Sequence, residues 1–120
     1  MRAGELIAAV DALRPNQYST GQKLRWLALL DQKLESEVLS VYEEVDANRS
    51  PDYGEETALL APFPYDWELY TNWLFAQIDL MNAEIVKSNQ SMTLFAAAWR
   101  QLADAMNRRH AVKNRGAWRL

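Results

Sequence analysis

Apolar residues recur at helical spacing along most of this chain. The clearest stripe lies in the second quarter, with successive intervals of three, four, four, three and four residues. It consists of Leu27, Leu30, Leu34, Val38, Val41 and Val45. Spacing of this kind places apolar side chains on one face of an α-helix. Ser19 and Gln22 have the spacing of a capping box just before the stripe, so we predict a helix from residue 20 to about residue 45.

A shorter helix is predicted at the start of the chain, over residues 3–13, where apolar residues again recur at helical spacing. Pro15 ends it, because the residue before a proline disfavours the helical backbone conformation. Residues 46–63 lack this periodicity and contain turn-forming asparagine, serine, proline and glycine. We therefore expect an irregular segment there.

The second half of the chain predicts two long helices. No glycine or proline occurs from Tyr65 to Arg115, which favours continuous helix over about residues 66–87 and 91–110. The short connection at residues 88–90 predicts an antiparallel hairpin, with Ser91 as the N-cap of its second helix.

The third predicted helix carries two apolar stripes on roughly opposite sides. One consists of Trp67, Tyr70, Leu74, Ile78, Met81 and Ile85, and the other of Leu69, Trp73, Ala76, Leu80 and Ala83. A surface helix of a monomer needs only one stripe. Either the third helix is central in a bundle, or one stripe binds another molecule. In the second case Leu69, Trp73 and Leu80 are the candidates for self-association.

Composition limits the size and class of the protein. With 120 residues, of which 49% are hydrophobic and 24% charged, the chain is long enough for one globular domain. We expect an all-α domain over residues 1–110, a small bundle of about four helices with an antiparallel C-terminal hairpin. No apolar run is long enough to span a bilayer, and the N-terminus does not have the layout of a signal peptide.

Charge is sorted along the chain, although the net charge is only -3. Residues 35–68 hold ten acidic residues and one basic residue, whereas residues 100–120 hold six basic residues and one acidic residue. The irregular segment is thus an acidic loop, and residues 111–120 form a basic tail. Separated charges of this kind can steer a molecule onto a partner or onto copies of itself.

The residues needed for most enzyme mechanisms are missing. The chain has no cysteine and one histidine, His110, which excludes thiolate chemistry and any mechanism that needs two imidazoles. It also lacks a Glu-x-x-His pair for a di-metal bundle, a nucleophile elbow and a glycine-rich phosphate loop. We expect no enzymatic activity, no catalytic residue, no cofactor and no metal.

The basic tail leaves nucleic-acid binding open as a function. Its arginines and Trp118 could contact phosphates, but a sequence pI near 5.1 is unlike that of a typical nucleic-acid-binding domain. A non-viral helical interaction or regulatory protein with a basic DNA-contacting arm is therefore the alternative to the function considered next.

Several short segments resemble one family. They are Asn16-Gln17-Tyr18-Ser19, Leu24-Arg25-Trp26-Leu27, Leu30-Asp31, Leu59-Leu60, Pro64-Tyr65-Asp66, Leu69-Tyr70, Ala76-Gln77-Ile78-Asp79, Asn82-Ala83-Glu84-Ile85, Phe95, Trp99 and Met106-Asn107-Arg108. Together they resemble the head–tail connector proteins of long-tailed bacteriophages and prophages, which are also called adaptor or head-completion proteins. The likeness extends from about residue 16 to about residue 109.

The resemblance implies a structural virion protein at the neck, made in the cytoplasm of the bacterial host. Copies of such a connector form a dodecamer-type ring under the portal protein, extend the DNA channel and dock the next neck or tail-completion component. DNA passes through without sequence-specific binding, and no membrane is involved.

Two sets of residues can be assigned on that hypothesis. A contact with the portal is expected from Arg108, Arg109, Lys113, Arg115, Trp118 and Arg119. An acidic channel lining or rim, which would repel DNA and let it slide, is expected from Glu43, Glu44, Asp46, Asp52, Glu55 and Glu56.

Overall fold

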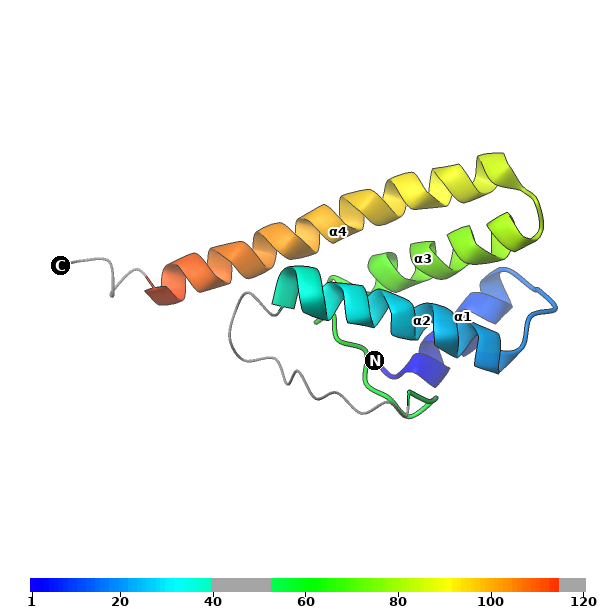
Figure 1. Ribbon diagram of the computed structural model, residues 1–120, viewed down its shortest axis with the longest axis horizontal. Coiled ribbons are helices and arrows are strands. Elements are labelled where there is room, and N and C mark those ends of the chain that lie inside the picture. Colours follow the sequence, from blue (N-terminus) through cyan, green and yellow to red (C-terminus); the bar gives the residue numbers. More distant parts are fainter. Residues whose placement is uncertain (40–52, 115–120) are drawn as a thin grey trace.

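The computed structural model describes residues 1–39 and 53–114, and within them it confirms an all-α bundle with a C-terminal helical hairpin (Figure 1). The elements are α1 (Ala3–Leu13), α2 (Thr20–Leu34), a π-helical turn η1 (Glu35–Leu39), α3 (Asp66–Met81) and α4 (Ile85–Asn114). The side chains of residue 39 and of residues 110–114 are outside this description.

The first two helices follow their local sequence signals. α1 has the predicted bounds. α2 begins directly after Ser19, whose Oγ accepts a hydrogen bond from the Gln22 amide at 3.1 Å, as the predicted cap requires. The helix then widens into η1, and the predicted continuation to Val45 lies outside the described residues after Leu39.

The hairpin turn lies six residues earlier than predicted. α3 ends at Met81, and Ala83 adopts a left-handed backbone conformation with φ of 60°. The Glu84 amide donates to the Asp79 carbonyl at 2.8 Å and the Ala83 amide to the Leu80 carbonyl at 3.0 Å. This pair of bonds is a Schellman motif, which usually has glycine at the left-handed position. Because alanine stands there instead, the sequence carries no sign of the turn.

Early closure of the hairpin moves two serines into the interior. Ser88 and Ser91, expected in the turn and at the N-cap, lie inside α4 and are buried. The Ser88 Oγ donates to the Ala76 carbonyl at 2.9 Å and so links α4 to α3. The fourth helix also continues to Asn114, four residues into the segment predicted as tail.

Replacing Ala83 by glycine is expected to raise the free energy of unfolding by about 0.5–1 kcal/mol. The left-handed conformation costs an L-residue roughly 1–2 kcal/mol, and glycine avoids this cost. Part of the gain in stability is lost again, because glycine gives the unfolded chain more conformational freedom. Urea unfolding measures the change. The control is Ala97→Gly in the exposed interior of α4, which should lose about 1 kcal/mol. A loss in both variants would contradict the prediction.

The central position of α3 accounts for both of its apolar stripes. Leu69 from one stripe and Tyr70, Leu74 and Ile78 from the other are all buried in the same core. α3 packs against α1, α2 and α4, and the Trp73 Nε1 donates to the Trp26 carbonyl of α2 at 2.8 Å. The two stripes thus contact different neighbours within one chain.

The molecule is elongated, with extents of 58 × 31 × 19 Å. Its long dimension follows α4, which at 30 residues is about 45 Å long. The last turns of α4 project past the ends of α3 and of the continuous helix α2–η1 (Figure 1). This helix therefore presents part of its surface outside the bundle.

Candidate functional site

A buried carboxylate, that of Asp31 on α2, organises the polar interior. The Tyr70 hydroxyl of α3 donates to the Asp31 Oδ1, and the Tyr53 hydroxyl donates to the Asp31 Oδ2 at 2.9 Å. The Tyr70 oxygen also accepts the Ala61 amide at 2.8 Å. Burial raises the pKa of Tyr70 far above its usual value, and the negative charge of Asp31 and its hydrogen bond raise that pKa further.

This network holds the fold together rather than forming a reactive site. Asp31 is 1% exposed and Tyr70 is completely buried, so a substrate has no access to either group. Their bonds join α2, α3 and the segment before α3. A fully satisfied buried network of this kind specifies one arrangement of the elements that it connects.

Two partly buried ion pairs attach α1 and the residue after it to the remainder of the bundle. Arg14, which follows α1, pairs with the buried Asp79 of α3 and stacks over the Phe75 ring, with 4.2 Å between the guanidinium carbon and the ring centroid. The Lys23 ammonium of α2 pairs with Asp11 of α1 at 2.7 Å. Both pairs lie where the helices pack.

Sequence reasoning missed these buried charges, although one signal was present. Asp31 follows Leu30 and precedes Leu34 on the apolar face of α2, and a charged residue at such a position indicates a buried partner. Asp79 belongs to neither apolar stripe of the third helix, so its spacing gives no sign of burial. It is buried because Arg14, distant in sequence, compensates its charge.

The described residues hold neither a cluster of metal ligands nor a membrane-spanning helix. Within residues 1–39 and 53–114, no three side chains of the histidine, cysteine, aspartate or glutamate types come together in a way that could hold a metal ion. No helix in these ranges combines the length and apolar character needed to cross a bilayer.

The predicted portal-contact residues lie at and beyond the projecting end of α4. Arg108 and Arg109 are exposed near this end. Lys113 belongs to the last turn of α4, although its side chain is outside the description. Arg115, Trp118 and Arg119 lie outside the described residues. The two described arginines thus stand on the part of the molecule that extends farthest from the bundle.

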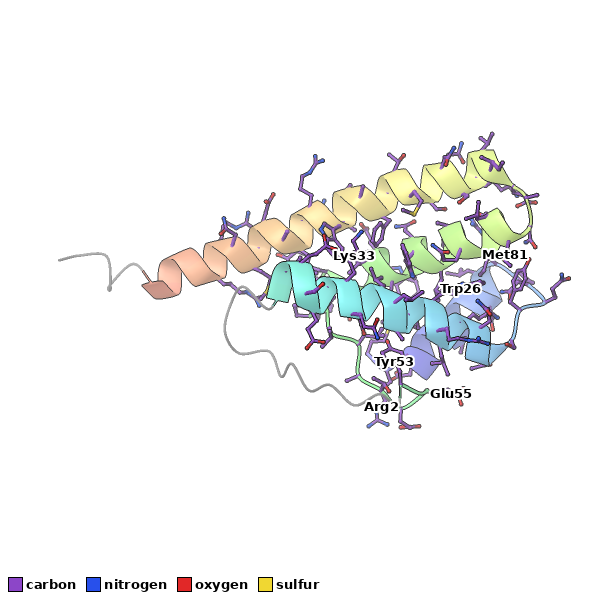
Figure 2. The ribbon with its side chains drawn as sticks, in the orientation of Figure 1. Arg2, Trp26, Lys33, Tyr53, Glu55 and Met81 are labelled. Carbon is purple, nitrogen blue, oxygen red and sulfur yellow. The ribbon has the colours of Figure 1, made fainter. Side chains whose placement is uncertain are left out.

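Of the six residues predicted to form an acidic channel lining or rim, two lie within the described part of the chain. Glu55 and Glu56 are exposed beside the start of α1, where the Glu55 carbonyl accepts the Gly4 amide at 2.9 Å and Glu56 pairs with Arg2 (Figure 2). Glu43, Glu44, Asp46 and Asp52 lie outside the described residues.

The three candidates for self-association separate in space. Leu69 is completely buried in the chain's own core and so has no surface to offer a second subunit. Trp73 is half-buried, with its ring 5.2 Å from that of Phe95. Only Leu80 is freely exposed. The stripe that holds these three residues is therefore covered within the chain at Leu69, partly covered at Trp73 and open only at its end, at Leu80.

Exposed apolar and aromatic side chains lie elsewhere on the surface. A groove of about 380 Å³ runs between η1 and α4, and Lys33 lies at its edge between α2 and α4 (Figure 2). Its lining consists of Lys33, Glu37, Phe95, Ala96, Trp99, Arg100 and Ala103. A second hollow, of about 590 Å³, continues over the outer side of α4.

Comparisons with protein-family models, with curated proteins and with solved structures find no match to this chain.

Proposed function

We propose that this chain is a structural adaptor of the phage head–tail connector kind, which assembles with copies of itself into a ring and binds a portal protein. One contrast carries the proposal. The polar groups of Asp31, Tyr70 and Asp79 are buried and paired, whereas large apolar residues remain exposed on the surface, among them Phe63, Trp67, Leu80 and Met81. Such a surface suits protein–protein contact.

The projecting end of α4 supports a role for this helix in joining two components. A ring subunit needs two different faces for its neighbours and a further surface for the component above or below it. The bundle can supply the faces, while Arg108 and Arg109 are exposed near the C-terminal end of α4. An exposed basic helix end is complementary to an acidic surface on a portal.

Reversing the charge of Arg108 and Arg109 together is expected to abolish binding to the portal protein encoded in the same genome. The test is light scattering of the full chain mixed with that portal, which gives the mass of any complex. Arg25→Glu is the matched control, because Arg25 is exposed on α2, away from the end of α4, and it should bind as the parent does.

Failure of the parent chain to form any complex with the portal would overturn the proposal. Salt-dependent binding of the parent to double-stranded DNA, lost in the Arg108→Glu/Arg109→Glu variant, would favour the alternative of a regulatory protein with a DNA-contacting arm. Retained portal binding by this variant would remove the end of α4 from the contact.

A further inference from the structure

Two aromatic side chains stand exposed where the chain enters α3. Phe63 is 84% exposed and Trp67, on the first turn of α3, is 40% exposed. With Pro64, which is also exposed, they form a surface that we name the aromatic knob. Single exposed apolar residues are common on proteins. Two large aromatic residues four positions apart are a feature of binding surfaces, since aromatic side chains dominate the energy of many interfaces.

The groove between η1 and α4 has matching chemistry. Trp99 and Phe95 supply an aromatic lining, with 6.0 Å between their ring centroids. The Lys33 ammonium lies 5.8 Å from the centroid of the Trp99 ring. At about 380 Å³, the groove is at the small end of the range for ligand pockets. It has the size and character to receive aromatic side chains rather than a folded element.

The charges beside the knob and the groove are also complementary. Glu68 follows Trp67 and is exposed, whereas Arg100 lines the groove and is exposed. The carboxylate that also lines the groove, that of Glu37, lies 3.9 Å from the Lys33 ammonium, which offsets its charge. Neither Glu68 nor Arg100 forms an ion pair with another residue in the described part of the chain. The Glu68 carboxylate beside the knob and the Arg100 guanidinium in the groove are therefore both able to form an ion pair with another molecule.

We infer that the aromatic knob of one copy docks into the η1–α4 groove of a second copy. Glu68 of the first copy then faces Arg100 of the second. The contact is heterologous, because each copy contributes a different surface, so it propagates into rings or open chains rather than stopping at a symmetric dimer. This inference rests on the proposed function in that it identifies the subunit contact of the proposed ring.

The size of the two surfaces sets the strength of the contact. An aromatic side chain buries about 150–250 Å². Because Phe63 is 84% exposed and Trp67 is 40% exposed, the two together have roughly 200–300 Å² left to bury. A stable interface needs about 800 Å² from each partner. A single contact of this kind should therefore be weak, and assembly should depend strongly on protein concentration.

Sedimentation velocity of the full chain between about 10 μM and 1 mM tests the inference. We expect the average mass to rise above the 13.8 kDa monomer as concentration increases. A knob variant, Phe63→Ser, and a groove variant, Arg100→Glu, should each remain monomeric, because each lacks one half of every contact. Circular dichroism should show an unchanged fold in both, since both side chains are exposed.

Mixing the two variants gives the decisive result. The groove of the Phe63→Ser chain and the knob of the Arg100→Glu chain are both intact, so the mixture should form a one-to-one dimer and nothing larger. Leu29→Ser is the matched control, because Leu29 is an exposed apolar residue of α2 outside both surfaces, and it should assemble as the parent does.

A parent chain that stays monomeric over the whole range would overturn the inference, as would assembly of either variant alone or a mixture without dimers. These outcomes are distinguishable from failure of the proposed function. If the chain binds the portal but the knob and groove do not associate, the adaptor role stands and the subunit contact is wrong. If the two variants form dimers when mixed but the chain does not bind the portal, the contact stands and the connector role is wrong.

Discussion

Replacing Arg14 by alanine is expected to lower the free energy of unfolding by about 2–4 kcal/mol. The Asp79 side chain is 2% exposed, and Arg14 is its ion-pair partner, so the substitution leaves a buried carboxylate without compensation. Breaking a buried pair by removing one partner costs about 3–5 kcal/mol. The expected loss is smaller here because the Arg14 side chain is itself 36% exposed, and water already screens part of the attraction.

Urea denaturation followed by circular dichroism measures the Arg14→Ala loss, as a fall in the transition midpoint with little change in slope. Arg14→Lys is an informative second variant, since it keeps the charge but loses the planar stacking over Phe75. It should lose about 1 kcal/mol. Arg25→Ala, on the exposed side of α2, controls for loss of an arginine. A loss below 1 kcal/mol for Arg14→Ala would show that the ion pair does not secure α1.

Replacing Tyr70 by phenylalanine is expected to cost about 2–4 kcal/mol. The change removes one oxygen that serves two buried partners, because it donates to Asp31 and accepts the Ala61 amide. Each buried group left unsatisfied costs about 1–3 kcal/mol. Tyr53→Phe is the matched control, since it removes one bond to the same carboxylate from a half-buried ring. It should cost about 1 kcal/mol. Equal losses in the two variants would contradict the central role of Tyr70.

The dependence of the free energy of unfolding on alkaline pH is a second measure of the role of Tyr70. Its pKa is raised by burial and by Asp31, so the folded chain keeps a proton that the unfolded chain releases above about pH 10. The stability linked to this group is complete below pH 10 and declines above it, by up to about 1.4 kcal/mol per pH unit. Tyr70→Phe should remove this component of the slope, and Tyr53→Phe should retain it.

Local signals predicted the bounds of α1 and the start of α2. The Ser19 cap and the bounds of α1 depend only on neighbouring residues, which is why the spacing of apolar and capping residues located them. The hairpin turn was misplaced because Ala83 adopts a conformation that glycine normally marks. Without that marker, the absence of glycine and proline could not separate α3 from α4.

The candidate surfaces also divide into those that neighbouring residues in the sequence predict and those that form only when distant segments pack together. The basic charge of the C-terminal segment and the resemblance to connectors together selected Arg108 and Arg109, and both are exposed near the C-terminal end of α4. The η1–α4 groove could not be predicted, since Lys33 and Trp99 meet only when α2 and α4 pack together. Leu69 was a candidate for self-association but is buried in the chain's own core. An apolar stripe in a sequence does not show whether the surface that covers it belongs to the same chain or to another.

The sequence by itself determined the helical class, the number of helices, the capping of α2 and the separation of acidic from basic segments, because these depend on residues close together along the chain. Only the tertiary structure decided that α3 is central, that Asp31 and Asp79 are buried with partners, and that the knob and the groove are both exposed. Those outcomes depend on which helix faces pack together, and packing brings together residues as distant as Arg14 and Asp79.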